Sequence, residues 1–248
     1  MNNVFRTIIC TMLRENGAYI KDILALLSME RNLKETREYY MEYNCIFKID
    51  YKTFLNNFSR IRKLNLIGEI PKIINFHKLW HFECRLFNRP ISSFGNLTYF
   101  RCFTFNQPVS SFGKLTHFIC SDFNQPVSSF GNLKYFICRD FNWPVSSFGN
   151  LTHFNCLQFN QPLYSFGNLT HFICFEFNQP LSSFERLKHF ICFEFNQHVS
   201  SFGNLTLFAC FRFNQPVSSF GNLTHFKCWD FRQPVTNYGN LKHFNELF

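Results

Sequence analysis

The chain has 248 residues, a formal net charge of +9 and 37 phenylalanines. Ordinary globular domains are led by Leu, Ala and Gly, so an excess of one large apolar residue indicates that a single structural slot is filled many times. Residues 1–75 carry 12 Lys+Arg and 8 Asp+Glu, whereas residues 76–248 carry 13 and 8. The surplus is diffuse and forms no basic stripe, which argues against nucleic acid as a partner.

Targeting signals are also missing from the sequence pattern. No apolar stretch reaches the roughly 18 residues that a membrane helix needs, so no membrane association is expected. The short apolar run from Thr7 to Leu13 lies between Arg6 and Arg14 and lacks a small-residue cleavage site, unlike a signal peptide. These features predict a cytoplasmic or nuclear location.

The N-terminal part has a helical hydrophobic period and no repeat. Two apolar runs, 5–13 and 20–33, are separated by a loop at Asn16-Gly17. They predict a small α-helical module over residues 1–45, followed by a helical linker or N-terminal cap over 46–60. Such a piece is either a plain cap for the array that follows or a separate docking module.

From Ile61 to the end, the sequence repeats every 18 residues without a slip in register. The ten coils begin at Ile61, Leu79, Leu97, Leu115, Leu133, Leu151, Leu169, Leu187, Leu205 and Leu223, with a partial coil from Leu241. An unbroken period over so many coils is typical of a solenoid, in which each coil stacks on the previous one in the same way. Residues 61–248 are therefore predicted to form one solenoid.

Each coil is numbered here from its leading residue as position 1. Apolar residues recur at positions 1, 4, 6, 9, 13 and 16, with the L-x-x-F-x-C spacing of a leucine-rich repeat. Alternation at positions 4 and 6 predicts a short strand with those side chains inward and positions 3, 5 and 7 outward. Strands of successive coils should pair in a parallel sheet, about 4.8 Å apart. The segment N-Q-P-V-S-S-F-G-N predicts turns or a single 3₁₀ turn on the return side.

Three polar columns recur with the coils. The Asn at position 10, from Asn88 to Asn214, is expected to face inward and satisfy backbone groups of the turn and the next coil. The Cys at position 6, from Cys84 to Cys228, fits a small apolar core slot, because neighbouring parallel strands rarely allow a disulfide and no C-x-x-C pair suggests zinc. Most His residues lie at position 3, where we interpret them as exposed strand residues and not metal ligands. No cofactor is expected.

Positions 5, 7 and 8 vary between coils, whereas the core and turn positions are nearly constant. Variation on the strand face of a solenoid is what a binding surface would show. The predicted partner-binding residues are Phe103, Arg139, Phe175, Phe193, Phe211 and Trp229 at position 7, and Glu176, Glu194, Arg212 and Asp230 at position 8. Four of the aromatic residues occupy successive coils. They form an apolar contact ridge if exposed, and a structural feature if a flank covers them.

The phrase F-N-Q-P-[VL], followed by a loop and N-L-T-H-F, resembles the FNIP repeat, a leucine-rich-repeat relative of amoebae and the giant viruses that infect them. The resemblance covers about three quarters of the chain, with Phe and Cys where that family usually has Leu, Thr and Phe-Gly. It implies a mainly β, leucine-rich-repeat-like solenoid with a parallel sheet, preceded by the small α-helical module.

The segment from Lys21 to Ser28, K-D-I-L-A-L-L-S, resembles an F-box, although Val4-Phe5 stands where the usual Leu-Pro start would be. The resemblance implies a substrate-recruiting subunit of an SCF-type ubiquitin ligase, in the host cytoplasm if the protein is viral. Ile8, Ile9, Leu24 and Leu27 would contact a Skp1-like adaptor, and the solenoid would hold a protein target. The alternative is a stand-alone repeat scaffold whose N-terminus is only a cap. No nucleophile–base set, phosphate loop or paired carboxylates stand out, so no enzyme is expected.

Overall fold

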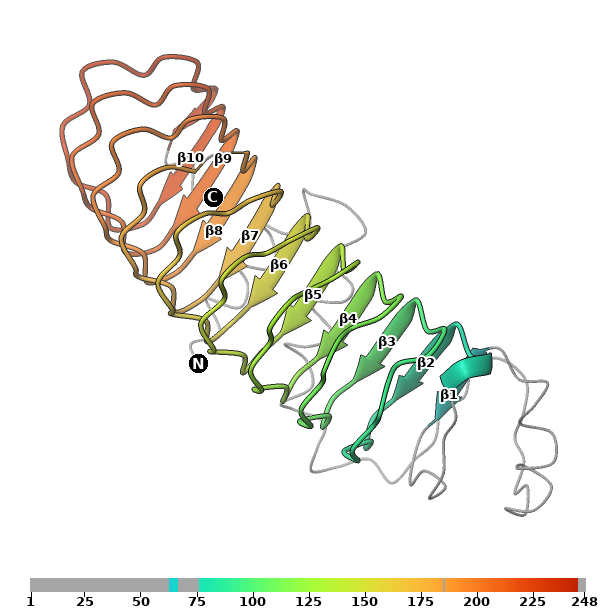
Figure 1. Cartoon of the computed structure of the whole chain (residues 1–248). Coiled ribbons are helices and arrows are strands. Elements are labelled where there is room, and N and C mark those ends of the chain that lie inside the picture. The colour runs from blue at the N-terminus through green and yellow to red at the C-terminus, as the bar shows by residue number, and fades with distance from the viewer. Residues whose placement is uncertain (1–62, 67–75, 185, 245–248) are drawn as a thin grey trace. The chain divides into compact units, whose positions relative to one another are not determined.

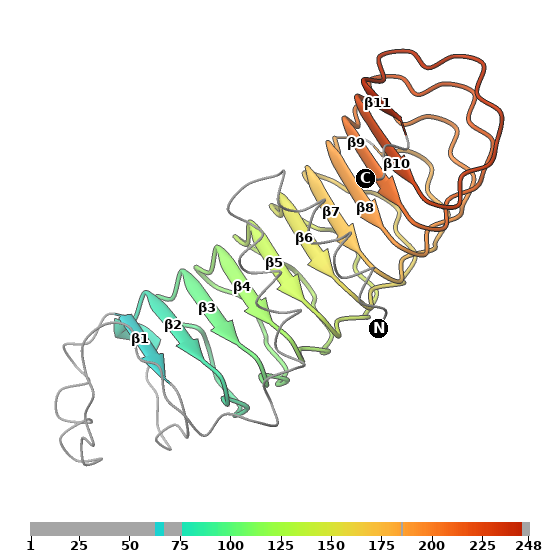
Figure 2. The same ribbon diagram turned by 180° about the vertical axis from the view of Figure 1, so that it is seen from behind.

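A computed structural model describes residues 63–66, 76–184 and 186–244, all within one compact unit, Ile49–Phe248. The strands lie side by side in chain order, and the rest of each coil returns on the opposite side (Figures 1 and 2). The elements are β1 (Lys63–Leu66), η1 (Phe76–Lys78), β2 (His81–Cys84), β3 (Tyr99–Cys102), β4 (His117–Cys120), β5 (Tyr135–Cys138), β6 (His153–Cys156), β7 (His171–Cys174), β8 (His189–Cys192), β9 (Leu207–Cys210), β10 (His225–Cys228) and β11 (His243–Phe244). The predicted helical module and linker, residues 1–60, lie outside the described residues.

The sheet has the register that the repeat predicts. All strand pairs are parallel, and each residue faces its counterpart one coil later, as with Phe100 and Phe118 or Cys102 and Cys120. The described strands form one 11-stranded sheet in the order β1 to β11. The parallel-sheet solenoid of 18-residue coils is therefore confirmed over these residues. No helix within the described ranges is long and apolar enough to cross a membrane.

Phenylalanine fills the interior in three columns, at positions 4, 9 and 16. In the columns at positions 4 and 9 each ring stacks on its counterpart in the next coil, and most rings at position 16 do so: Phe100 and Phe118 have centroids 5.5 Å apart and planes at 9°. Rings of different columns meet edge to face, as Phe100 and Phe105 do at 5.2 Å and 69°. Both geometries suit the ring quadrupole, and such pairs contribute roughly 0.5–1.5 kcal/mol beyond their burial. The repeated slot inferred from composition is thus the stacked aromatic core.

Where the structure describes it, the return side consists of turns and irregular segments, apart from the 3₁₀ helix η1 at positions 16–18 of its coil. In a typical coil the backbone N–H of Leu151 donates to the carbonyl oxygen of Phe148 at 3.0 Å. Gly149, inside this turn, has a φ of +55°, a left-handed conformation that favours glycine. The hydroxyl of Ser147 accepts the N–H of Gly149 at 3.0 Å. These bonds explain why S-F-G-N-L recurs.

The Asn column at position 10 links successive coils. Asn160 Oδ1 accepts the backbone N–H of Asn178 and the side-chain amide of Gln179, both at 3.0 Å. One oxygen therefore pairs a backbone donor just beyond the strand and fixes the neighbouring Gln. The ladder to the next coil was predicted, but the expected inward direction was wrong: Asn124 and Asn142 are exposed, and Asn160 is half-buried. The Asn side chains lie along the rim of the stack because the N–H groups that they accept hydrogen bonds from lie there.

Candidate binding surface

The outward residues that vary between coils differ in how enclosed they are. Most of column 5, the residues at position 5 in the middle of each strand, is buried: Ile119 and Ile137 are 1% exposed and Asn155 is 4% exposed. Glu83, Arg101 and Ile173 in the same column are half-buried. Columns 7 and 8, the positions just past the strand, are more accessible: Trp229 is 45% exposed, and Ser121, at 5%, is a buried exception in column 7. The accessible part of the variable surface is therefore columns 7 and 8.

Asn155 interrupts the apolar run of column 5 between Ile137 and Ile173. Its Nδ2 is buried and has no hydrogen-bond partner. Leaving a buried amide unpaired costs roughly 1–3 kcal/mol, so this is a weak point in an otherwise regular sheet.

The aromatic column comprises the position 7 residues of four successive coils: Phe175, Phe193, Phe211 and Trp229. Adjacent ring centroids are 4.7, 4.5 and 5.7 Å apart, with interplanar angles of 22°, 20° and 8°. The three phenylalanines are half-buried and the indole is exposed. The four rings therefore form one continuous stack, which ends at the exposed Trp229.

The acidic column comprises Asp122, Asp140, Glu176, Glu194 and Asp230, all at position 8. Residues 76–248 contain eight Asp+Glu in total, so five of the eight acidic side chains of this part lie in one column. The column runs directly beside the aromatic column, because positions 7 and 8 are adjacent in every coil. Negative side chains are thus concentrated in one column of a chain whose net charge is positive.

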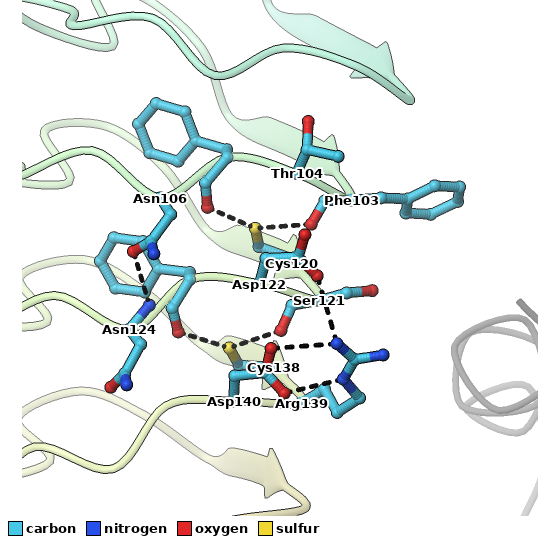
Figure 3. Close-up of polar contacts among 12 residues, drawn as sticks. Phe103, Thr104, Asn106, Cys120, Ser121, Asp122, Asn124, Cys138, Arg139 and Asp140 are labelled. Atoms are coloured by element: carbon cyan, nitrogen blue, oxygen red, sulfur yellow. Dashed lines mark hydrogen bonds and ion pairs between the residues drawn. The ribbon is translucent and has the colours of Figure 1, made fainter. Parts of the chain in front are cut away.

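Arg139, predicted as a binding residue, is held by two members of the acidic column (Figure 3). Its Nε lies 2.7 Å from Asp140 Oδ1, one terminal nitrogen lies 3.0 Å from Asp140 Oδ2, and that nitrogen is 3.5 Å from Asp122 Oδ1. A planar fork on a carboxylate is the favoured geometry for guanidinium. Burial raises the pKa of the Asp122 carboxyl, and the charge of Arg139 opposes that rise.

Other arginines lie close to aromatic rings of column 7. The guanidinium of Arg212 lies 5.9 Å from the ring centroid of Phe193 and 3.2 Å from Glu194. Those of Arg85 and Arg101 lie 5.9 and 6.0 Å from the ring of Phe103. Such distances are typical of cation–π attraction. The carboxylates and rings of columns 7 and 8 therefore bind guanidinium groups of the chain's own arginines at several places.

Glu176 and Asp230 differ from the rest of the acidic column. Among the described residues, neither carboxylate has an ion pair or a side-chain hydrogen bond, although each lies beside an aromatic ring, Phe175 or Trp229. Glu176 is exposed and Asp230 is half-buried. The two predicted residues thus present carboxylates at the surface without a cation from the described chain.

The nine described cysteines are free and buried. Sequence reasoning gave them only an apolar role, but seven of them donate an S–H bond to a position 9 carbonyl one coil earlier, as Cys120 does to Phe105 at 3.0 Å. Burial raises the pKa of Cys138 to about 12, so the thiolate form is suppressed. Within the described ranges, no group of three or more His, Cys, Asp or Glu could hold a metal ion.

The His residues at position 3 are half-buried, except His81, which is buried, so the expectation of exposed histidines was wrong. The rings stack, with His153 and His171 at 4.1 Å and 14°. The hydroxyl oxygen of Thr152 lies 3.1 Å from the carbonyl oxygen of Lys134 and 2.8 Å from Nδ1 of His153, so it links the preceding coil to the His column. Burial, and then neighbouring histidines, lower the pKa of His153 to about 4 and that of His171 to about 3.

The predicted adaptor-binding residues Ile8, Ile9, Leu24 and Leu27 lie outside the described residues. No protein-family model, no curated protein and no solved structure matches the chain. The geometry of columns 7 and 8 therefore carries the functional argument.

Proposed function

We propose that this protein is a binding scaffold whose solenoid holds a protein partner on columns 7 and 8. The observation that carries the proposal is the contrast between an almost invariant frame and side chains that change from coil to coil at an accessible surface. A stack of aromatic rings that ends in an exposed tryptophan has the composition that protein interfaces favour at their centres. A solenoid presents such side chains as one extended surface.

The binding surface is tested by placing a photo-crosslinker on it. Benzoylphenylalanine replaces Phe211 in column 7, and in a matched variant it replaces Ser200 on the exposed return side. Both proteins are irradiated with an amoebal cell extract, and the adducts are identified by mass spectrometry. The proposal predicts one discrete protein adduct from position 211 that is absent from position 200. The same adducts from both positions, or none, would reject it.

We further propose, from the sequence resemblance of residues 1–45 to an F-box, that the scaffold recruits its partner to a ubiquitin ligase. The full chain and a chain lacking residues 1–45 are compared for binding to a purified Skp1-like adaptor. Retention of the adaptor by the full chain alone supports the ligase role. Failure of both to bind removes the ligase role and leaves the scaffold proposal intact, because that proposal depends only on columns 7 and 8.

A further inference from the structure

The acidic and aromatic columns restrict the chemistry of the partner. We infer that the partner's contacting segment is a polypeptide rich in arginine, whose side chains pair with Glu176 and Asp230 and pack on the aromatic column. The inference rests on the proposed scaffold function and names the class of segment that the scaffold holds.

The chain's own arginines show what columns 7 and 8 accept. Arg139 makes a two-pronged contact with Asp140, and Arg212 combines an aromatic ring with a carboxylate, Phe193 with Glu194. An incoming guanidinium at Glu176 or Asp230 would meet the same combination, because Phe175 and Trp229 lie next to these carboxylates in the chain. Guanidinium suits such a place better than ammonium, since it is planar, less strongly hydrated and able to stack on a ring.

Charge distribution points to the same class of partner. The rest of the chain is basic, so a basic segment is repelled elsewhere and attracted to the acidic column. Glu176 and Asp230 lie three coils apart along the stack, with Glu194 and Arg212 between them. Arg212 places one positive charge in the middle of this stretch. A segment with arginines separated by small residues can reach the two outer carboxylates without a third cation opposite Arg212.

Binding is measured with the full chain and a fluorescein-labelled peptide of alternating glycine and arginine, by fluorescence anisotropy at low salt. Two control peptides carry citrulline, the neutral isostere, or lysine in place of arginine. The arginine peptide should bind, the lysine peptide should bind about tenfold more weakly, and the citrulline peptide should not bind at the same concentrations. Added sodium chloride should weaken binding, because ion pairs at the surface are screened.

The double variant Glu176→Gln with Asp230→Asn should lose about tenfold in affinity, and Trp229→Leu should also weaken binding. The matched control is Glu83→Gln, which removes a carboxylate from β2, outside columns 7 and 8, and keeps an amide oxygen beside His81. Its affinity should stay close to that of the unaltered chain. Circular dichroism of each variant checks that the solenoid is intact.

Two outcomes overturn the inference. One is equal binding of the arginine and citrulline peptides, and the other is an equal loss for Glu83→Gln and the double variant. No binding of the arginine peptide, together with a discrete adduct from position 211, rejects the arginine-rich partner alone and keeps the scaffold. Absence of both the peptide binding and the adduct rejects both.

Discussion

The Sγ–H of Cys156 donates a hydrogen bond to the carbonyl oxygen of Phe141, 3.0 Å away and one coil earlier. Both groups are buried in the interior, Cys156 with 0% of its surface exposed. A buried carbonyl needs a donor, and here the solenoid supplies it with a thiol in the column between the phenylalanines. The cysteine is therefore a small apolar residue and a donor at the same time.

Replacing Cys156 by serine or alanine separates these two roles. The substitutes have nearly the same volume, but only serine retains a donor for Phe141. We expect Cys156→Ser to be more stable than Cys156→Ala by about 1 kcal/mol, the usual net value of a hydrogen bond. Urea unfolding followed by circular dichroism gives the comparison. A purely apolar slot would reverse the order, with alanine the more stable variant.

The repeat spacing alone predicted the parallel register, the inward apolar residues and the turns, because each follows from a strict period and from local backbone preference. The Cys156 bond was not predictable in this way. Its acceptor belongs to the preceding coil, and whether a thiol points at that carbonyl depends on the path of the turn. The fork of Arg139 on Asp140 was missed for a similar reason, since adjacent letters in the sequence do not show that the two side chains meet. The burial of Ile119 in column 5 was also missed, because strand alternation alone assigns position 5 to the outer face of the sheet.

Acid should destabilise the solenoid through its His column. Unfolded histidine takes up a proton near pH 6.5, but in the folded chain His153 does so only near pH 4 and His171 near pH 3. Between these values the unfolded chain binds more protons, so stability is lost as the pH falls below about 6.5 and is unaffected above it. Thermal unfolding at a series of pH values from 7.5 to 4 should show the decline.

Leu207 occupies the same column without a charge, which suggests the variant for this test. Replacing His153 and His171 by leucine should reduce the decline in melting temperature between pH 6.5 and 4. The matched control is His198→Gln, on the exposed return side, which should leave the decline unchanged. An identical pH profile for the leucine variant and the unaltered chain would show that the column does not govern acid sensitivity.

Removing the unpaired amide of Asn155 should stabilise the sheet. Isoleucine occupies column 5 on both neighbouring strands, at Ile137 and Ile173, so Asn155→Ile continues an apolar column already present. The variant should gain about 1–3 kcal/mol in the free energy of unfolding, the cost of leaving the buried Nδ2 without a partner. The reciprocal change Ile137→Asn should lose stability. A loss for Asn155→Ile would mean that the amide is paired in solution.

The left-handed turn glycines should not be equally replaceable. A methyl group on Gly149 would meet no atom within 4 Å, so Gly149→Ala carries only the strain of its φ of +55°, about 1–2 kcal/mol. On Gly95 the same methyl would lie 2.9 Å from the backbone N of His77 and 2.9 Å from the backbone C of Phe76. Gly95→Ala should therefore lose more stability in urea unfolding than Gly149→Ala.

Asparagine at Gly149 separates strain from contact, because asparagine tolerates the left-handed region better than alanine does. Gly149→Asn should be more stable than Gly149→Ala, whereas Gly95→Asn should gain little over Gly95→Ala, since its Cβ meets the same backbone atoms. Equal losses for alanine at the two glycines would contradict this difference. That result would mean that the chain at η1 moves aside at little cost, so that the left-handed φ alone determines which residue each turn accepts.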